Sequence, residues 1–144
     1  VDGYIVSDVG VADSMVIGEF LKKSRIFRDV GPGVLAGAAK EMKLVTYAPG
    51  EFVIQQGETG DKFFLIRSGT VEVLKEKQGR MEPLGTLGPG DFFGELALLR
   101  DEPRAATIKA LESLEVFILP KAKFDEIVHA SSNFREQLKK EYFH

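Results

Sequence analysis

An acidic and a basic residue stand nine positions apart in the segment FFGELALLRDEPRAATIKA, residues 92–110. The acid, Glu95, follows Gly94, and the base, Arg104, follows Pro103. An arginine carries a permanent positive charge and a planar set of N–H donors that suits phosphate oxygens. A carboxylate repels phosphate but accepts hydrogen bonds from hydroxyl groups. The pair therefore indicates a ligand that presents an anion and a hydroxyl group side by side.

The residues around this pair favour close approach of a ligand to the backbone. GELALL, residues 94–99, is typical of one helical turn entered through a glycine. The first N–H groups of a helix are unpaired and carry a partial positive charge, so they attract anions. Small residues let such N–H groups come close to a ligand, and here they are Gly94, Ala97, Ala105 and Ala106. A cyclic nucleotide meets these requirements, because its phosphate ring leaves only the ribose 2′-OH free to donate.

Three motifs resemble those of a known family. FGELALLRDEPRAAT (93–107) resembles the phosphate-binding cassette of cyclic nucleotide-binding domains, especially those of regulatory subunits of cyclic-AMP-dependent protein kinase. GDKFFLIRSGTVEV (60–73) is similar to the family's preceding strand pair, and LGPGDFFGE (87–95) to the approach to the cassette. The likeness extends over about residues 15–142.

The resemblance implies a role for each matching residue. Glu95 would accept a hydrogen bond from the ribose 2′-OH, and Arg104 would pair with an exocyclic phosphate oxygen. Asp61 would brace Arg104 and fix its rotamer, and Val73 would line the base side of the pocket. The remaining ligand-binding residues would be Gly94, Leu96, Ala97, Ala105 and Ala106.

Two further features concern the base of the nucleotide. Ala105 stands where cyclic-GMP-dependent kinases commonly carry a threonine whose hydroxyl meets the guanine amino group, so cyclic AMP is favoured over cyclic GMP. In this family a hydrophobic residue of a C-terminal helix often caps the base. The candidates are Phe134, Leu138, Tyr142 and Phe143. Spacing alone does not choose between them, and a stripe at 134, 138 and 142 is also typical of ordinary helix packing.

Composition excludes several other classes of function. The chain has 144 residues, and its 19 basic against 22 acidic residues give a net charge of −3, which argues against nucleic acid as a partner. It has no cysteine, so disulfides and thiolate nucleophiles are excluded, and its two histidines lie at 129 and 144. No metal or cofactor is expected. No apolar run reaches the roughly 20 residues of a membrane helix. We expect no membrane insertion and a cytoplasmic location, or one on the cytoplasmic face of a membrane protein.

The order of elements predicts an α+β domain: a small, jelly-roll-like antiparallel β-barrel with flanking N- and C-terminal helices. Residues 1–13 have no clear periodicity and are interpreted as a linker or flexible arm. The domain proper is expected over 14–144, with Ser14 as an N-cap, helices within 14–42, the barrel at 43–119 and C-terminal helices at 120–144. Strands are expected at 43–47, 51–55, 62–67, 70–76, 81–87, 104–111 and 114–119.

The resulting hypothesis is a regulatory module that binds a cyclic nucleotide and is not an enzyme, because no nucleophile–base pair is evident. Repacking of the C-terminal helices would switch an effector outside this chain: a kinase, a channel or another protein. The alternative is the sensor domain of a catabolite-activator-type transcription regulator without its DNA-binding part. A cupin-like metal enzyme is disfavoured, because residues 43–119 contain no histidine.

Overall fold

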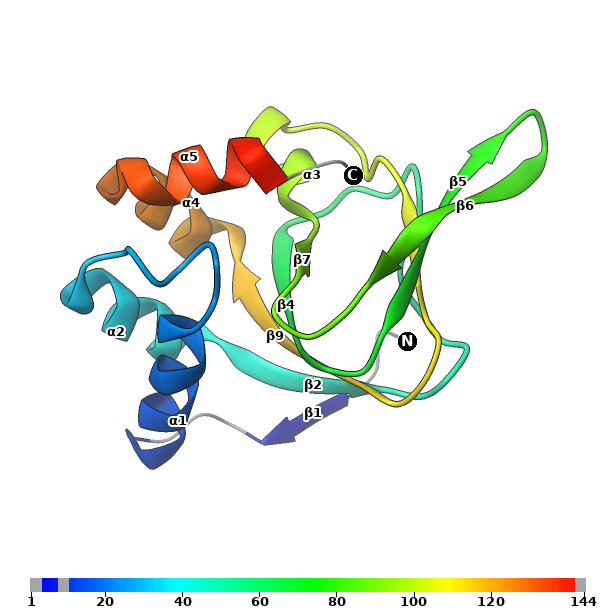
Figure 1. Ribbon diagram of the computed structural model, residues 1–144. Helices are drawn as coiled ribbons and strands as arrows, with labels where there is room; N and C mark the ends of the chain where they lie inside the picture. The colour runs from blue at the N-terminus through cyan, green and yellow to red at the C-terminus, as the bar shows by residue number, and fades with distance from the viewer. Residues whose placement is uncertain (1–3, 8–10, 142–144) are drawn as a thin grey trace.

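Two antiparallel sheets form a barrel, and helices from both ends of the chain pack beside it (Figure 1). The computed structural model describes residues 4–7 and 11–141. The five-stranded sheet has the order β1-β2-β9-β4-β7, and the four-stranded sheet has the order β3-β8-β5-β6. The elements are β1 (Tyr4–Ser7), α1 (Val11–Lys22), α2 (Pro32–Glu41), β2 (Lys43–Tyr47), β3 (Phe52–Ile54), β4 (Lys62–Ser68), β5 (Val71–Lys77), β6 (Arg80–Leu87), β7 (Phe92–Phe93), α3 (Glu95–Arg100), β8 (Thr107–Ala110), β9 (Leu114–Pro120), α4 (Lys121–Ala130) and α5 (Ser132–Glu141).

The five-stranded sheet separates two hydrophobic cores. Successive side chains of a strand point to opposite faces. In β4, Phe63 and Leu65 join the core formed with the helices, whereas Phe64 and Ile66 join the core inside the barrel. Figure 1 shows α1, α2, α4 and α5 gathered on one side of the barrel, while the β5–β6 hairpin extends on the other. The unbroken apolar run of β4 is therefore buried on both faces.

An aromatic cluster joins the helices to β4. The ring of Phe63 lies 5.0 Å from that of Phe124 in α4 and 6.5 Å from that of Phe134 in α5, centroid to centroid. Phe27, in the segment between α1 and α2, lies 5.1 Å from Phe134. Tilted and edge-to-face pairs at these distances stabilise beyond the burial of their area. The cluster thus fixes both terminal helical segments against the same strand.

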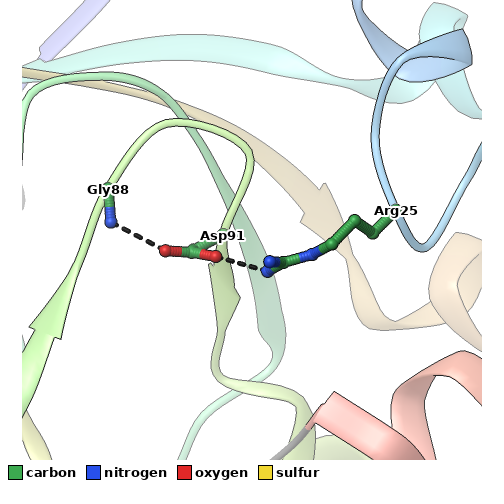
Figure 2. A network of polar contacts seen from close by, with 3 residues as sticks. All are labelled: Arg25, Gly88 and Asp91. Carbon is green, nitrogen blue, oxygen red and sulfur yellow. Dashed lines mark hydrogen bonds and ion pairs between the residues drawn. The ribbon is translucent and has the colours of Figure 1, made fainter.

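A polar network ties the segment between α1 and α2 to the turn between β6 and β7 (Figure 2). One carboxylate oxygen of Asp91 accepts a hydrogen bond from the backbone N–H of Gly88, at 2.9 Å. The other accepts one from the guanidinium of Arg25. This turn leads directly into β7 and α3, so the network positions the approach to the residues around Glu95.

The structure confirms the fold class, and each expected strand has a counterpart. The strand expected at 104–111 is shorter and spans only Thr107–Ala110, so Arg104 lies in the loop before it. Ser131 caps α5, because its hydroxyl accepts a hydrogen bond from the N–H of Phe134 at 3.1 Å. Among the described residues, no helix combines the length and apolar character that crossing a membrane requires.

Part of the segment 1–13, expected as a linker or flexible arm, forms regular secondary structure where the structure describes it. Residues 4–7 form the edge strand β1, in which Tyr4 pairs with Thr46 and Ile5 with Val45. Helix α1 begins at Val11, so Ser14 lies inside the helix and not at its N-cap. The pairing partner of β1 is about 40 residues away in the sequence, and local periodicity does not detect such a contact.

Candidate functional site

Gly94, in the left-handed backbone region, makes the turn from β7 into α3. Gly94 has φ 90° and ψ 0°, a backbone conformation that residues with a Cβ rarely adopt, and α3 begins at the next residue. The neighbouring atoms also favour a glycine at position 94, because a Cβ there would lie 2.7 Å from Nη1 of Arg104 and 3.1 Å from the carbonyl oxygen of Lys62. The sequence GE at 94–95 therefore produces a sharp turn from β7 into the helix.

Arg104 is held by backbone carbonyl groups. Its Nη1 donates to the carbonyl oxygen of Gly94 at 2.9 Å, and its Nη2 donates to that of Lys62 at 3.0 Å. The guanidinium carbon lies 5.7 Å from the centroid of the Phe64 ring, and only 5% of the residue is exposed. A guanidinium has five N–H donors, so this arrangement fixes the group and retains donors for an anion.

The backbone of Arg104 is fixed as well. Its N–H donates to the carbonyl oxygen of Glu58 at 2.8 Å, and its own carbonyl oxygen accepts from the N–H of Gly57 at 2.9 Å. The two bonds join the loop before β8 to the loop between β3 and β4. The charged side chain therefore projects from a backbone that is anchored on both sides.

Glu95 and Arg104 are both buried, and the charge of each acts on the other. Glu95 is fully buried, and burial raises its pKa from the ordinary value of 4.5 to about 7, although a backbone hydrogen bond and the charge of Arg104 lower it. Burial also lowers the pKa of Arg104, while the charges of Asp61, Glu58 and Glu95 raise it. The site thus places an acid that titrates near neutral pH within the field of a permanent cation.

Asp61 does not brace Arg104 in the way expected. Its side chain is 79% exposed, and its carboxylate lies 3.8 Å from Nζ of Lys62. Its charge still acts on Arg104 and raises the pKa of that residue. In this structure the guanidinium is held directly by the carbonyl oxygens of Gly94 and Lys62, which accept hydrogen bonds from Nη1 and Nη2.

The structure places the other expected site residues at different depths. Val73 is fully buried in the barrel core, in register with Ile108 of β8 and Gly85 of β6. Ala97 and Ala106 are 4% and 3% exposed, and Ala105 is half-buried. Leu96 belongs to α3, but its side chain lies outside the described part of the chain.

Two of the expected base-capping residues have a packing role in this structure. Phe134 and Leu138 are 0% and 1% exposed and belong to the core between the helices and the sheet, whereas Val73 belongs to the barrel core. Their apolar side chains are already buried against Phe63 and its neighbours. Tyr142 and Phe143 lie outside the described residues.

Sequence reasoning missed three residues that surround Arg104. These are Gly60, whose backbone lies against the guanidinium, Lys62, whose carbonyl accepts from it, and Phe64, whose ring lies near it. All three fall within the motif 60–73, but a carbonyl partner leaves no signature in the residue type. Within residues 4–7 and 11–141, no group of three or more His, Cys, Asp or Glu side chains is arranged to hold a metal ion.

Comparison with known proteins connects this geometry to a family. Residues 44–131 match the family model described as the cyclic nucleotide-binding domain. A cAMP-dependent protein kinase regulatory subunit of Mycosarcoma maydis is 46% identical over 92 residues, covering 64% of this chain and 18% of that protein. A cGMP-dependent protein kinase of Caenorhabditis elegans is 36% identical over 141 residues, covering 96% of this chain and 18% of that protein. The chain thus spans about a fifth of the length of these curated relatives.

The chain is also similar to solved structures. The regulatory domain of Toxoplasma gondii PKA, crystallised with cAMP, has a TM-score of 0.77 and 26% identity over 85% of this chain and 48% of that chain. The catabolite activator protein of Thermus thermophilus has a TM-score of 0.72 and 26% identity over 81% of this chain and 55% of that chain. The family model covers most of the chain, from Leu44 in β2 to Ser131, the residue after α4. This chain therefore belongs to the cyclic nucleotide-binding domain family.

Proposed function

We propose that this chain senses a cyclic nucleotide, binds cyclic AMP in preference to cyclic GMP, and has no chemistry of its own. The observation that carries the proposal is the buried pair of Glu95 and Arg104, which are 0% and 5% exposed. Burying two ionisable groups costs free energy, and buried groups with shifted pKa values are common at functional sites. A ligand with a phosphate beside a ribose hydroxyl would interact with both groups.

Each group has a distinct role in the proposed complex. Arg104 pairs with an exocyclic phosphate oxygen through the donors that the Gly94 and Lys62 carbonyls leave available. Glu95 accepts a hydrogen bond from the 2′-OH. The backbone N–H groups of Ala97 and Ala105 complete the phosphate shell, and Leu96 and Ala106 lie beside them. Val73 lies on the base side of the pocket.

The preference for cyclic AMP depends on Ala105. The relatives include both a cAMP-dependent regulatory subunit and a cGMP-dependent kinase, so family membership alone does not select the base. An alanine lacks the hydroxyl that a threonine at this position would offer to the guanine amino group. A site without that acceptor loses the hydrogen bond by which guanine would be favoured.

The signal would pass from α3 to the C-terminal helices. Leu98 of α3 is 3% exposed and belongs to the same core cluster as Ile127 of α4 and Leu138 of α5. Because a packed core does not deform continuously, a shift of α3 on phosphate binding would change how α4 and α5 pack. Binding would thus shift the population of two arrangements of these helices.

The effector lies outside this chain, and we propose a protein kinase in the cytoplasm. Both curated relatives described above are kinase proteins, one a regulatory subunit and one a kinase itself. The sensor of a catabolite-activator-type transcription regulator is the alternative, which the similarity to the Thermus thermophilus protein supports. The sequence flanking residues 14–144 in the full-length protein distinguishes them, because that regulator type requires a DNA-binding helix-turn-helix.

Calorimetric titration of the purified chain with cyclic AMP, cyclic GMP and 5′-AMP tests the proposal. We expect cyclic AMP to bind most tightly, cyclic GMP more weakly and 5′-AMP weakest, because 5′-AMP has no phosphate ring and carries an extra free hydroxyl. Equal affinity for 5′-AMP and cyclic AMP, or no binding of either cyclic nucleotide, would contradict the proposed function.

A further inference from the structure

The guanidinium of Arg104 occupies the space that a side chain at position 60 would need. An ideal Cβ built on Gly60 would lie 2.0 Å from Nε, 2.1 Å from Cζ and 2.5 Å from Nη2 of Arg104. Real Cβ atoms essentially never approach another heavy atom within 3.0 Å. The charged group therefore lies directly against the backbone of Gly60, and no residue larger than glycine fits there while Arg104 keeps its place.

Backbone conformation does not explain this glycine. Gly57 and Gly94 have φ values of 90°, in the left-handed region, whereas the φ of Gly60 lies outside that region. An alanine at position 60 would therefore adopt the same backbone without strain. The three heavy atoms nearest to that Cβ all belong to Arg104.

We infer that Gly60 is a positioning residue, which sets the place of the Arg104 guanidinium by leaving it room against the backbone. The inference rests on the proposed function only for its effect on binding. The carbonyl oxygens of Gly94 and Lys62 hold Nη1 and Nη2, and the Phe64 ring lies 5.7 Å from Cζ. A guanidinium displaced from Gly60 must lengthen or lose at least one of these contacts.

A methyl group at position 60 should move Arg104 and leave the barrel intact. The colliding atoms belong to the end of a long side chain with several rotatable bonds, which moves more readily than the backbone. The fold therefore survives, and the anion loses a donor that is correctly placed. A charge-assisted hydrogen bond contributes about 1.5–3 kcal/mol, so the loss of one corresponds to roughly ten-fold weaker binding or more.

The test compares Gly60→Ala with Gly33→Ala, in α2. A Cβ on Gly33 would meet nothing within 4 Å, and the φ of Gly33 also lies outside the left-handed region. We expect Gly60→Ala to weaken cyclic AMP binding by roughly ten-fold or more, and Gly33→Ala to leave it within about two-fold. Combining Gly60→Ala with Arg104→Ala should weaken binding no further than Arg104→Ala alone, because the displaced group is then absent.

A measurement without ligand separates this inference from the proposed function. In nitrogen-15 spectra, the Arg104 Nε–H signal, assigned by its loss in Arg104→Lys, should shift in Gly60→Ala and not in Gly33→Ala. An unshifted signal would overturn the inference, even if the wild-type chain binds cyclic AMP. A shifted signal would support it, even if no cyclic nucleotide binds.

A folding defect in Gly60→Ala also has a defined reading. If the Gly60→Ala chain does not fold, the same substitution is made in the Arg104→Ala chain. Recovery of the native circular-dichroism spectrum and a cooperative unfolding transition would support collision with Arg104 as the cause. Failure to fold in that background as well would overturn the inference, because the defect would then have another origin.

Discussion

Nη1 of Arg104 donates a 2.9 Å hydrogen bond to the carbonyl oxygen of Gly94, the residue directly before Glu95. The basic residue of the site is therefore joined by one hydrogen bond to the backbone that carries the acidic residue. A movement of α3 that shifts Gly94 therefore moves the carbonyl oxygen that accepts from Arg104. Conversely, a displaced Arg104 no longer donates to the residue before α3. The two charged residues are thus coupled through this hydrogen bond as well as through their charges.

Replacing Arg104 by alanine should weaken cyclic AMP binding by about 2–4 kcal/mol, because a buried phosphate loses its charged partner. Isothermal titration calorimetry measures the change. Arg67→Ala is the matched control, because the side chain of Arg67 projects from the neighbouring β4 and is 40% exposed. Equal affinities of the Arg104→Ala chain and the wild-type chain would remove Arg104 from the site.

Glu95 should make the stability of the ligand-free chain fall as pH rises. Its pKa is about 7 when folded against an ordinary value of 4.5, so between these values the folded chain binds more protons than the unfolded chain. The contribution is fully present below pH 4.5 and is lost as pH rises through about 7. The full loss is of the order of 3 kcal/mol.

Glu95→Gln isolates this effect, because glutamine is nearly isosteric with glutamic acid and does not titrate. Urea unfolding of both chains at pH 5 and pH 8 should show the variant gaining about 2–3 kcal/mol relative to the wild type between the two conditions. Other titrating groups cancel in this comparison. A difference that is the same at both pH values would show that Glu95 does not titrate in this range.

The sequence predicted the local turn at Gly94 better than it predicted the contacts that hold Arg104. The pattern GELALL predicted one helical turn entered through a glycine, and the structure has Gly94 in the left-handed region and α3 from Glu95. Residue types alone indicated that Arg104 would bind an anion. They did not indicate that carbonyl oxygens hold its guanidinium, because every residue has a carbonyl group. Nor did they indicate that the guanidinium lies against Gly60, because a glycine is as typical of a turn as of a close contact.

The same limit explains the errors in the fold. β1 and the two-residue β7 are too short to show an alternating pattern, and they exist because β2 and β4 provide their partners. The apolar spacing of Phe134 and Leu138 fitted both a core stripe and a base cap. The structure places both side chains in the core, since Phe63 and Phe124 provide an aromatic surface that the sequence does not locate.

Ala105→Thr should narrow the preference for cyclic AMP over cyclic GMP. The new hydroxyl provides a hydrogen-bond partner for the guanine amino group, which contributes about 0.5–1.5 kcal/mol. Competition binding with both nucleotides measures the ratio of affinities. Ala122→Thr, on the exposed surface of α4, is the control for a threonine that does not face the site. An unchanged ratio in Ala105→Thr would refute the role of position 105.

Leu98→Ala should weaken the link between the site and the C-terminal helices. Leu98 is 3% exposed in the core shared with α4 and α5, whereas its neighbour Leu99 in α3 is 40% exposed. In the wild type, cyclic AMP should change amide hydrogen exchange in residues 121–141. That change should be reduced in Leu98→Ala and kept in Leu99→Ala.

Stability is measured in parallel for these two variants, because truncating a buried leucine costs about 2–5 kcal/mol. The exchange comparison is therefore made at a temperature at which all three chains are folded. If ligand changes the exchange of α4 and α5 equally in all three chains, the signal does not pass through Leu98.

Asp91 should stabilise the chain more through the backbone than through its ion pair. The side chain of Arg25 is 51% exposed and that of Asp91 26% exposed, and ion pairs with this much exposure contribute about 0–1 kcal/mol. The bond from the Gly88 N–H to Asp91 closes the turn before β7.

Asp91→Asn keeps an acceptor for this N–H and should cost less than about 1 kcal/mol, whereas Asp91→Ala removes both contacts and should cost about 1–2 kcal/mol. Urea unfolding at low and high salt separates the two contributions, because salt screens only the ion pair. Equal losses in Asp91→Asn and Asp91→Ala would assign the stabilisation to the charge instead.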